Sequence, residues 1–299
     1  RVDVAVLEVG LGGRWDATSA TDPVAVAITG IGLDHTRILG DTLGQIACEK
    51  AAVIKPGRFV VLGEGTHVPE VQRVMDERCA ACGVTPCVVS YETLREPDRI
   101  GGVVSFRTRT PRAEYRVDMR KPAYQPQNAA CAIALAEGYL GCALNIGALE
   151  RSLDSCPIPG RFDVVRTDPL VLVDACHNPQ SCENFVRALN EVEPCMSNRP
   201  ALLIAALSDK DVSGIVDVLV PAFPQIVIAQ TASDRAMPAG ELADLVRAKL
   251  GELGRDEGDV LSVFEDVASA LDWATASGLE LVAAGTITLA GEVAGLLRG

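Results

Sequence analysis

The chain has 299 residues, a net charge of −13 and a pI near 4.7, a balance that argues against a general nucleic-acid-binding surface. Apolar residues make up 48% of the chain and aromatic residues 4%, which is typical of an Ala/Val/Leu-rich α/β protein long enough for two domains. No apolar run approaches the roughly 18 residues of a membrane span, and no signal peptide precedes the first apolar run. We therefore expect a cytoplasmic protein, with a monomer as the default.

The first half predicts alternating strands and helices up to about residue 90. Apolar runs predict strands at residues 2–8, 24–28, 59–62 and 86–89. Helical patterns occupy residues 43–55, 69–82, 126–140 and 146–155. Residues 103–109 and 115–117 alternate apolar and polar side chains, as a half-exposed hairpin would. The chain begins at Arg1, without a methionine and almost inside the first predicted strand, so we expect that a segment upstream is missing.

The second half is more regular and predicts a mainly parallel sheet. Strand-like runs lie at residues 162–166, 170–174, 201–205, 225–229, 260–264 and 279–283. Most are separated by single amphipathic helices, an alternation that places helices on both faces of the sheet. Before them, Cys156-Pro157-Ile158-Pro159-Gly160 can continue neither a helix nor a strand, and we interpret it as an interdomain linker. The predicted domains are residues 1–158 and 159–299.

Three polar side chains stand at places where a site can form in the first domain. Glu8 ends the first predicted strand, and His35 lies beyond the end of the second. The carboxyl ends of parallel strands share one crevice, where ligands bind. Lys50 lies on the apolar stripe of the helix predicted for residues 43–55, whose start has the capping-box spacing of Thr42 and Gln45. Lys50 either extends from the edge of that stripe to solvent or has a functional role.

Two short motifs are weak signals. Gly10-Leu11-Gly12-Gly13 follows a predicted strand, but Trp15 occupies the place of the third glycine of a dinucleotide-binding fingerprint. Cys79 and Cys82 form a C-x-x-C inside a helical pattern, without a second pair nearby. The ten cysteines are scattered through Ala-rich and apolar stretches, which favours reduced thiols in the core.

A stronger candidate is Asp174-Ala175-Cys176-His177-Asn178-Pro179, which follows one predicted strand and precedes a helix. An aspartate at a strand end can accept hydrogen bonds from ribose hydroxyls, and the helix start favours phosphate. Alternatively, Asp174 and Asn178 simply cap that helix. Arg161, just after the linker, can bind a phosphate through its guanidinium or remain solvated.

Together these motifs resemble the bacterial folylpolyglutamate synthase/dihydrofolate synthase family, the folate branch of the Mur ligase superfamily. The resemblance runs through nearly the whole chain in the right order, and its motifs are Glu8-Val9-Gly10-Leu11-Gly12-Gly13-Arg14, Asp16-Ala17-Thr18, Gly32-Leu33-Asp34-His35-Thr36 with Leu39-Gly40, Glu49-Lys50-Ala51, Lys55-Pro56-Gly57, Gln127-Asn128-Ala129-Ala130, Pro159-Gly160-Arg161-Phe162, Asp174 to Pro179, Ser208-Asp209-Lys210-Asp211 and Leu289-Ala290-Gly291-Glu292. It implies an α/β fold with an incomplete Mur-ligase central ATPase domain and a Rossmann-like C-terminal domain.

The resemblance also assigns roles to single residues. Glu8 and His35 match magnesium ligands, and Lys50 matches the lysine that takes up carbon dioxide to become a carbamate, N6-carboxylysine. Further matches are Asn128 to an ATP contact, Arg161 to a phosphate contact, Asp174 to the ribose contact and His177 to the nucleotide-facing motif. Trp15 falls where the family has a contact to the pterin substrate, usually Leu.

The implied reaction is ATP-dependent amide formation between the carboxylate of dihydropteroate, or the γ-carboxylate of a folate, and L-glutamate through an acyl phosphate. The chain departs from the family in one respect, since it contains no G-x-x-x-x-G-K-[ST] P-loop, which the family carries upstream of Glu8. We therefore expect little or no ligase activity from the chain alone. Two alternatives stay open, a non-catalytic remnant or binding module of the same fold and a cell-wall amino-acid ligase of the same superfamily.

Overall fold

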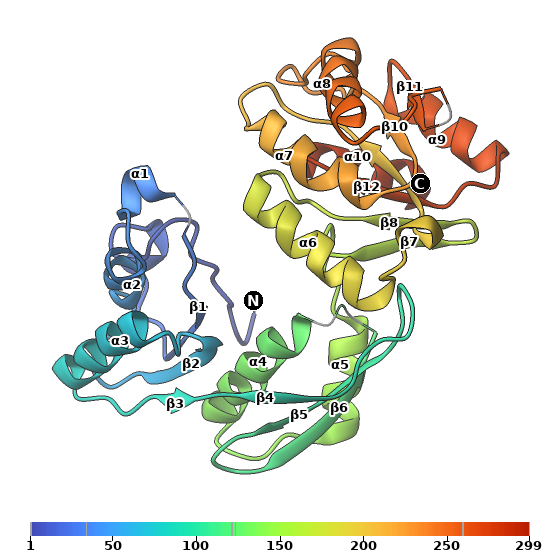
Figure 1. Cartoon of the computed structure of the whole chain (residues 1–299). Helices are drawn as coiled ribbons and strands as arrows, with labels where there is room; N and C mark the ends of the chain where they lie inside the picture. The colour runs from blue at the N-terminus through green and yellow to red at the C-terminus, as the bar shows by residue number, and fades with distance from the viewer. Residues whose placement is uncertain (1, 34, 121, 123, 259, 299) are drawn as a thin grey trace. The chain divides into compact units, whose positions relative to one another are not determined.

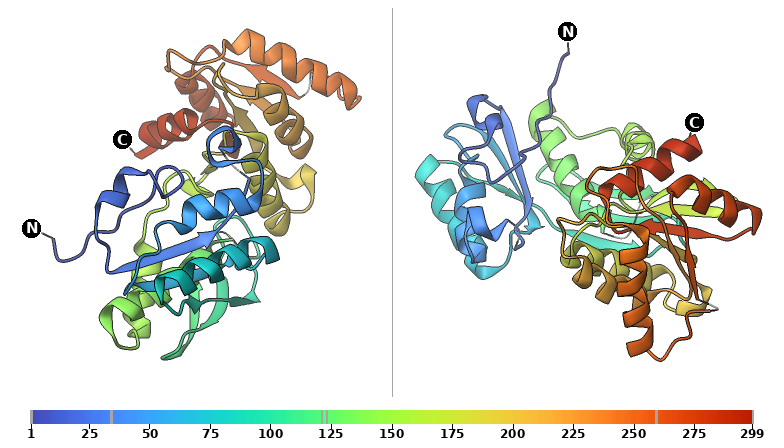
Figure 2. Two further views of the ribbon diagram at one scale, coloured as in Figure 1. Left: turned by 90° about the vertical axis from the view of Figure 1, so that its left-hand side faces the viewer. Right: turned by 90° about the horizontal axis from the view of Figure 1, so that it is seen from above.

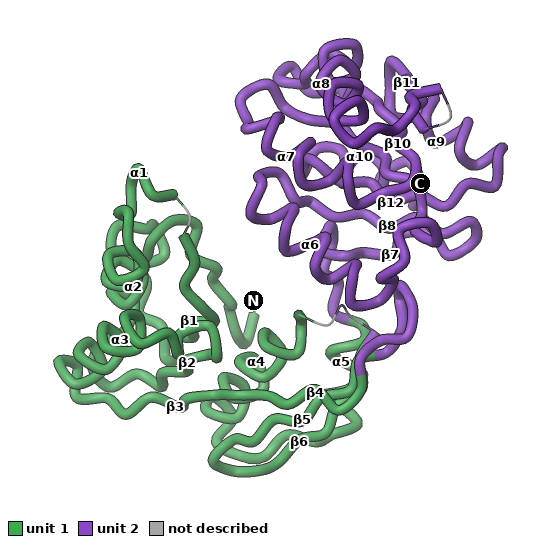
Figure 3. Tube along the Cα trace, viewed as in Figure 1, with its two compact units in different colours: residues 1–95, 104–119, 124–155 green, residues 96–103, 120–123, 156–299 purple. Residues whose placement is uncertain are grey.

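A computed structural model describes residues 2–33, 35–120, 122, 124–258 and 260–298, and the chain divides into two compact units (Figure 3). Unit 1 comprises residues 1–95, 104–119 and 124–155. Unit 2 comprises residues 96–103, 120–123 and 156–299. Both units combine helices with sheets, which confirms the predicted α/β class.

Unit 1 contains a three-stranded parallel sheet of order β1-β2-β3 with helices on both faces (Figures 1 and 2). Its elements are β1 (Ala25–Gly30), α2 (Leu43–Ala51), β2 (Phe59–Gly65), α3 (Pro69–Cys82), β3 (Cys87–Val88) and α4 (Gln125–Leu140). Successive side chains of a strand point to opposite faces. Val60 and Leu62 of β2 accordingly pack with α2 and α3, whereas Val61 packs with α4. The sheet is therefore buried on both sides, as the apolar runs of its strands predict.

A second, antiparallel sheet in unit 1 contains the predicted hairpin. Its strands are β4 (Tyr91–Arg95), β5 (Val104–Arg109) and β6 (Glu114–Met119), and α5 (Ile146–Ser155) contacts β6. Alternating residues such as Phe106 and Val117 are buried against Ile133 of α4, so the hairpin is confirmed. The additional strand β4 has no counterpart in the sequence prediction.

The prediction of a strand over residues 2–8 is wrong. This segment has no strand structure, and Val2 and Val6 expose 77% and 89% of their surface. A strand is stabilised only when its backbone N–H and C=O groups pair with a neighbour, and in the described part of unit 1 the edge strand β1 pairs with β2 alone. Glu8 therefore lies on an irregular, exposed segment rather than at a strand end.

Helix α2 begins as predicted and ends earlier than predicted. Thr42 and Gln45 form the expected capping box at its start. The helix ends at Ala51 instead of reaching residue 55, because the following residues form a turn ahead of Pro56. Ile46, Ala47 and Ala51 are buried, but Lys50 is only half-buried, so the prediction that Lys50 lies within the buried stripe is corrected to a place at its edge.

Unit 2 is built on a six-stranded sheet of order β11-β10-β9-β12-β8-β7. All pairings are parallel except that of β7 with β8. The strands are β7 (Asp163–Thr167), β8 (Leu170–Val173), β9 (Ala201–Ile204), β10 (Ile226–Ile228), β11 (Leu261–Val263) and β12 (Leu281–Ala284). Helices α6 (Pro179–Val192), α7 (Val212–Leu219) and α8 (Ala239–Glu252) cover one face, and α9 (Val267–Ala276) and α10 (Ile287–Arg298) cover the other (Figures 1 and 2). The predicted mainly parallel sheet is confirmed.

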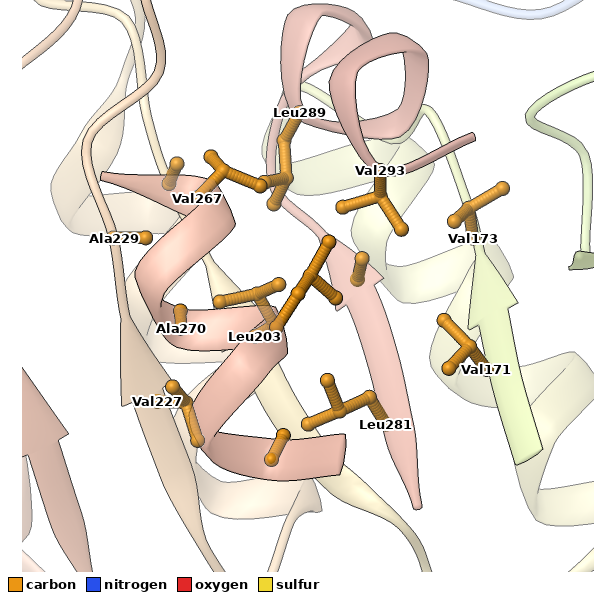
Figure 4. Close-up of a cluster of buried hydrophobic side chains, with 14 of the residues drawn as sticks. Val171, Val173, Leu203, Val227, Ala229, Val267, Ala270, Leu281, Leu289 and Val293 are labelled. Carbon is orange, nitrogen blue, oxygen red and sulfur yellow. The ribbon is translucent and has the colours of Figure 1, made fainter. Parts of the chain in front are cut away.

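One buried core of unit 2 lies between this sheet and helices α9 and α10 (Figure 4). Val171, Leu203 and Leu281 project from three neighbouring strands and are completely buried, as are Leu289 and Val293 of α10. Burying a side chain of this size contributes about 1.5–3 kcal/mol. This packing fixes the strands and therefore the loops that leave their carboxyl ends. Among the described helices, none combines the length and apolar character needed to cross a membrane.

Candidate functional site

Asp174 follows directly after the carboxyl end of β8 in unit 2, at the edge of the sheet where ligands bind in parallel α/β folds. Its side chain is buried, with 5% of the residue exposed. Oδ2 accepts a hydrogen bond from the Phe162 backbone N–H at 2.8 Å, and Oδ1 accepts one from the Cys176 N–H at 2.9 Å. Asp174 therefore ties the turn before β7 to the loop after β8, and it does not cap α6.

The electrostatics of Asp174 reflect this burial. Loss of solvent raises the pKa of its carboxyl, while the N–H groups of Phe162 and Cys176 and the charge of Arg161 lower it, and the net shift is upward. Each carboxylate oxygen has more than one lone pair, so both can accept a further hydrogen bond. The carboxylate of Asp174 therefore has acceptor capacity beyond its two backbone hydrogen bonds.

The turn that carries Arg161 has an unusual backbone. Phe162 has a φ of 50°, a left-handed conformation that costs a non-glycine residue roughly 1–2 kcal/mol. Its bond to Asp174 and the packing of its ring against Phe185, with centroids 5.7 Å apart, hold it there. Gly160, also left-handed at 67°, accepts a bond from the Ala175 N–H at 2.7 Å. Arg161, which lies between Gly160 and Phe162, is exposed. Its charge acts on the carboxyl of Asp174 and lowers the pKa of that group.

His177 and Asn178 lie at the start of α6. Asn178 is the N-cap, and its side chain and that of Ser181 form a capping box. The Nδ1 atom of His177 is 2.9 Å from the Ala175 carbonyl oxygen. Because a carbonyl only accepts, Nδ1 carries the proton, and in the neutral ring Nε2 is then left as an acceptor. Unit 2 therefore brings Arg161, Asp174 and His177 to one edge of its sheet.

In unit 1, the glycine-rich loop packs on the end of helix α2. Gly12 and Gly13 are buried, and a Cβ atom added to Gly13 would come within 3.0 Å of the Glu49 carbonyl oxygen and 3.1 Å of that of Lys50. Arg14 forms an ion pair with Glu49 at 2.9 Å. Trp15 follows with 88% of its surface exposed. The loop and the Glu49-Lys50 pair, which are far apart in the sequence, are therefore in contact.

The three residues predicted to bind metal lie on different segments of unit 1. Glu8 is exposed on an irregular segment, His35 is exposed with a φ of 50° at the start of α1 (Thr36–Leu39), and Lys50 is half-buried on α2. Within the described residues, no group of three or more His, Cys, Asp or Glu side chains could hold a metal ion. Magnesium prefers oxygen ligands. Glu8, His35 and Lys50 therefore suit this ion only if Lys50 carries a carbamate, because a carbamate has oxygen atoms and an ammonium group has none.

Asn128 lies in the first turn of α4 and is exposed. Its neighbour Gln127 donates through Nε2 to the Thr29 carbonyl oxygen near the end of β1, at 3.2 Å. Asn128 itself donates to the Gln125 side chain at 3.2 Å. The start of α4 is thereby fixed at the carboxyl edge of the β1-β2-β3 sheet.

Two structural roles at these sites were missed by the sequence analysis. Asp16 accepts four hydrogen bonds, from the N–H groups of Gly10, Leu11 and Thr18 and from the Thr18 hydroxyl. These bonds lower its pKa to about 2. The Asp-Ala-Thr spacing is a local signal for such a turn. The pairing of Arg14 with Glu49 had no local signal, because the two residues lie 35 positions apart.

Comparison with known proteins identifies a family and several enzymes to which this chain is similar. Residues 160–290 match the family "Mur ligase, glutamate ligase domain". A probable bifunctional folylpolyglutamate synthase/dihydropteroate synthase of Haloferax volcanii is 34% identical over 284 residues, which cover 92% of this chain and 32% of that protein. The dihydrofolate synthase/folylpolyglutamate synthase of Mycobacterium tuberculosis is 32% identical over 292 residues, 90% of this chain and 58% of that protein. Residues 160–290 are therefore assigned to the glutamate ligase domain of the Mur ligases, and the chain as a whole is similar to folylpolyglutamate synthases and dihydrofolate synthases.

Solved structures of folylpolyglutamate synthases agree with this assignment. The M. tuberculosis enzyme complexed with ADP and AMPPCP has a TM-score of 0.81 at 28% identity, and the comparison covers all of this chain (100%) and 69% of that one. The Thermotoga maritima enzyme has a TM-score of 0.82 at 25% identity, covering 99% of this chain and 66% of that one. The chain therefore corresponds to part of the length of these folylpolyglutamate synthases.

Proposed function

We propose that this chain carries the nucleotide site and part of the substrate site of an ATP-dependent ligase. The ligase joins L-glutamate to the carboxylate of dihydropteroate, or to the γ-carboxylate of a folate. The single observation that carries this proposal is the grouping of Arg161, Asp174 and His177 at the carboxyl edge of the unit 2 sheet. The relatives named folylpolyglutamate and dihydrofolate synthases support the choice of substrates.

In this proposal the three residues bind different parts of ATP. Asp174 has free lone pairs beside its two backbone bonds and accepts ribose hydroxyl groups. Arg161, exposed and held by the turn at Phe162, donates to phosphate oxygens. His177 contacts the nucleotide through Nε2, since Nδ1 is held by a carbonyl. The role of Asn128, which lies in unit 1, stays a prediction.

We further propose that Glu8, His35 and a carbamate formed on Lys50 hold a magnesium ion. The half-buried position of Lys50 at the edge of the α2 stripe is compatible with this modification, because a carbamate offers anionic oxygens. When bound, the ion neutralises charge that develops on the phosphates. The solved structure of the Yersinia pestis relative, described as complexed with AMPPNP and Mn ion, supports a divalent cation in this family.

The substrate carboxylate attacks the γ-phosphorus of ATP, the bond from that phosphorus to the β–γ bridging oxygen breaks, and ADP leaves. The acyl phosphate then reacts with the amine of L-glutamate to give a tetrahedral intermediate. Loss of a proton from nitrogen and of phosphate from carbon leaves the amide. Arg161 stabilises the charge on the transferred group, and Trp15 contacts the pterin ring. Such catalysis depends mainly on positioning and electrostatic stabilisation.

Isotope labelling tests this reaction. Because we expect little or no activity from the chain alone, it is first joined to the P-loop segment of a relative. Dihydropteroate carrying ¹⁸O in its carboxylate is incubated with this protein, ATP, magnesium and L-glutamate, and the masses of the products are measured by mass spectrometry. An acyl phosphate transfers one ¹⁸O atom to the released phosphate for each amide formed. Unlabelled phosphate accompanying amide formation would contradict the mechanism.

The same assay separates the alternatives. Turnover with a UDP-linked muramyl acceptor in place of dihydropteroate would instead support a cell-wall ligase. Nucleotide binding without turnover on either acceptor would support a non-catalytic binding module.

A further inference from the structure

The loop of residues 10–18 holds Trp15 between two anchored neighbours. On one side, Arg14 Nε donates to Glu49 Oε1 at 2.9 Å. On the other, the Asp16 carboxylate accepts the N–H groups of Gly10 and Leu11 at 3.0 and 2.9 Å. The Trp15 side chain itself is 88% exposed. The residues on both sides of Trp15 are thus fixed, while its ring faces solvent.

The loop is also packed on helix α2. An added Cβ at Gly13 would lie 2.9 Å from Val53 Cγ1 and 3.0 Å from the Glu49 carbonyl oxygen, which leaves room only for a glycine. Gly12, with a φ of 68°, approaches Leu39 in the same way. Packing therefore fixes the loop at Gly12 and Gly13. The ion pair with Glu49 fixes Arg14, the residue directly before Trp15.

The ion pair between Arg14 and Glu49 and the packing of the loop differ in how much they contribute to the stability of unit 1. Arg14 and Glu49 expose 47% and 27% of their side chains, and ion pairs of this kind contribute little to stability because solvent screens them. Breaking the pair leaves the packing of Gly13 and the bonds to Asp16 intact. The expected consequence is a change in where Trp15 points rather than unfolding of unit 1.

We infer that Arg14 and Glu49 are positioning residues for the aromatic ring of the substrate. Their ion pair holds Trp15 in the orientation that receives a flat heteroaromatic ring, so that little side-chain freedom is lost on binding. The inference rests on the proposed contact between Trp15 and the pterin.

The test uses dihydropteroate as the probe and Trp15 as the reporter. Trp273, the other tryptophan of the chain, is replaced by Phe, and the anisotropy of Trp15 emission and the Kd for dihydropteroate are measured. Glu49→Gln should lower the anisotropy and weaken binding about two- to five-fold. Arg14→Ala should do the same, Arg14→Lys should restore most of the affinity, and the double variant Arg14→Ala/Glu49→Gln should be no weaker than either single variant.

Glu92→Gln is the matched control, because it removes the carboxylate of another ion pair of unit 1, that with Arg107. If Glu49→Gln binds dihydropteroate as tightly as this control while Trp15→Ala binds it more weakly, the positioning role is overturned and the proposed pterin contact stands. A Trp15→Ala variant with unchanged affinity overturns the proposed pterin contact and this inference with it.

Discussion

Replacing Asp174 by asparagine removes a buried charge and one of two hydrogen-bond acceptors, and it tests how unit 2 holds its candidate site. The carboxylate accepts the Phe162 N–H at 2.8 Å and the Cys176 N–H at 2.9 Å. Asparagine keeps one oxygen, so one of these N–H groups would face the amide nitrogen, which is also a donor. The substitution therefore leaves a buried donor without an acceptor.

The expected cost follows from two opposing effects. A buried donor left unsatisfied costs about 1–3 kcal/mol. Removing the charge offsets part of this cost, because burial raises the pKa of Asp174 and so disfavours its ionised form. We expect a net loss of about 1–2 kcal/mol in the free energy of unfolding of unit 2, and a larger loss for Asp174→Ala, which removes both acceptors.

The assay is urea denaturation followed by the fluorescence of Trp273, a unit 2 residue that packs against Phe264, in a Trp15→Phe background. Asp209→Asn is the control, because Asp209 pairs with Arg235 on the surface and its loss should cost about 0–1 kcal/mol. If Asp174→Asn were as stable as this control, the bonds to Phe162 and Cys176 would not hold the turn, and the reasoning would be refuted.

Two further predictions concern the glycines and pH. Gly138→Ala should destabilise unit 1 by about 1–3 kcal/mol, because the added Cβ would overlap the Phe59 ring. Gly291→Ala on α10 should stabilise unit 2 by about 0.4–1 kcal/mol, because the added Cβ would meet open space. Urea denaturation of the two variants measures both changes in the free energy of unfolding. Asp16 has a pKa lowered from 3.8 to about 2, so its contribution to stability is complete above the higher value and is lost as the pH falls to the lower one. The emission of Trp15 should therefore change over this range, and Asp16→Asn should abolish that change.

The sequence predicted unit 2 well because its strands are continuous apolar runs that the sheet buries on both faces. Val171 and Leu281, for example, are completely buried in strands expected from their pattern alone. The same reasoning failed for residues 2–8, where an equally apolar run is exposed. Hydrophobicity predicts that a segment can be a strand, but pairing with a neighbour decides whether it is one.

The candidate site shows a similar limit. The position of Asp174 after a strand followed from local pattern. The alternative that both Asp174 and Asn178 cap α6 is correct for Asn178 and wrong for Asp174. The left-handed conformation of Phe162 could not be predicted, because it depends on a carboxylate 12 residues away and on packing against Phe185. Long-range contacts of this kind, like that between Arg14 and Glu49, carry no periodic signal.

Binding of the ATP analogue AMPPCP, which keeps the γ-phosphate that Arg161 is proposed to contact, tests the central claim most directly. Titration calorimetry should give one site, and Arg161→Ala should weaken it by about tenfold or more, as expected for loss of a charge-assisted bond to phosphate. The exposed Arg187, which donates a hydrogen bond to the nearby Asn184, provides the matched control Arg187→Ala, which should leave the Kd unchanged. An affinity equal in the two arginine variants, or no binding at all, would contradict the assignment of the nucleotide site.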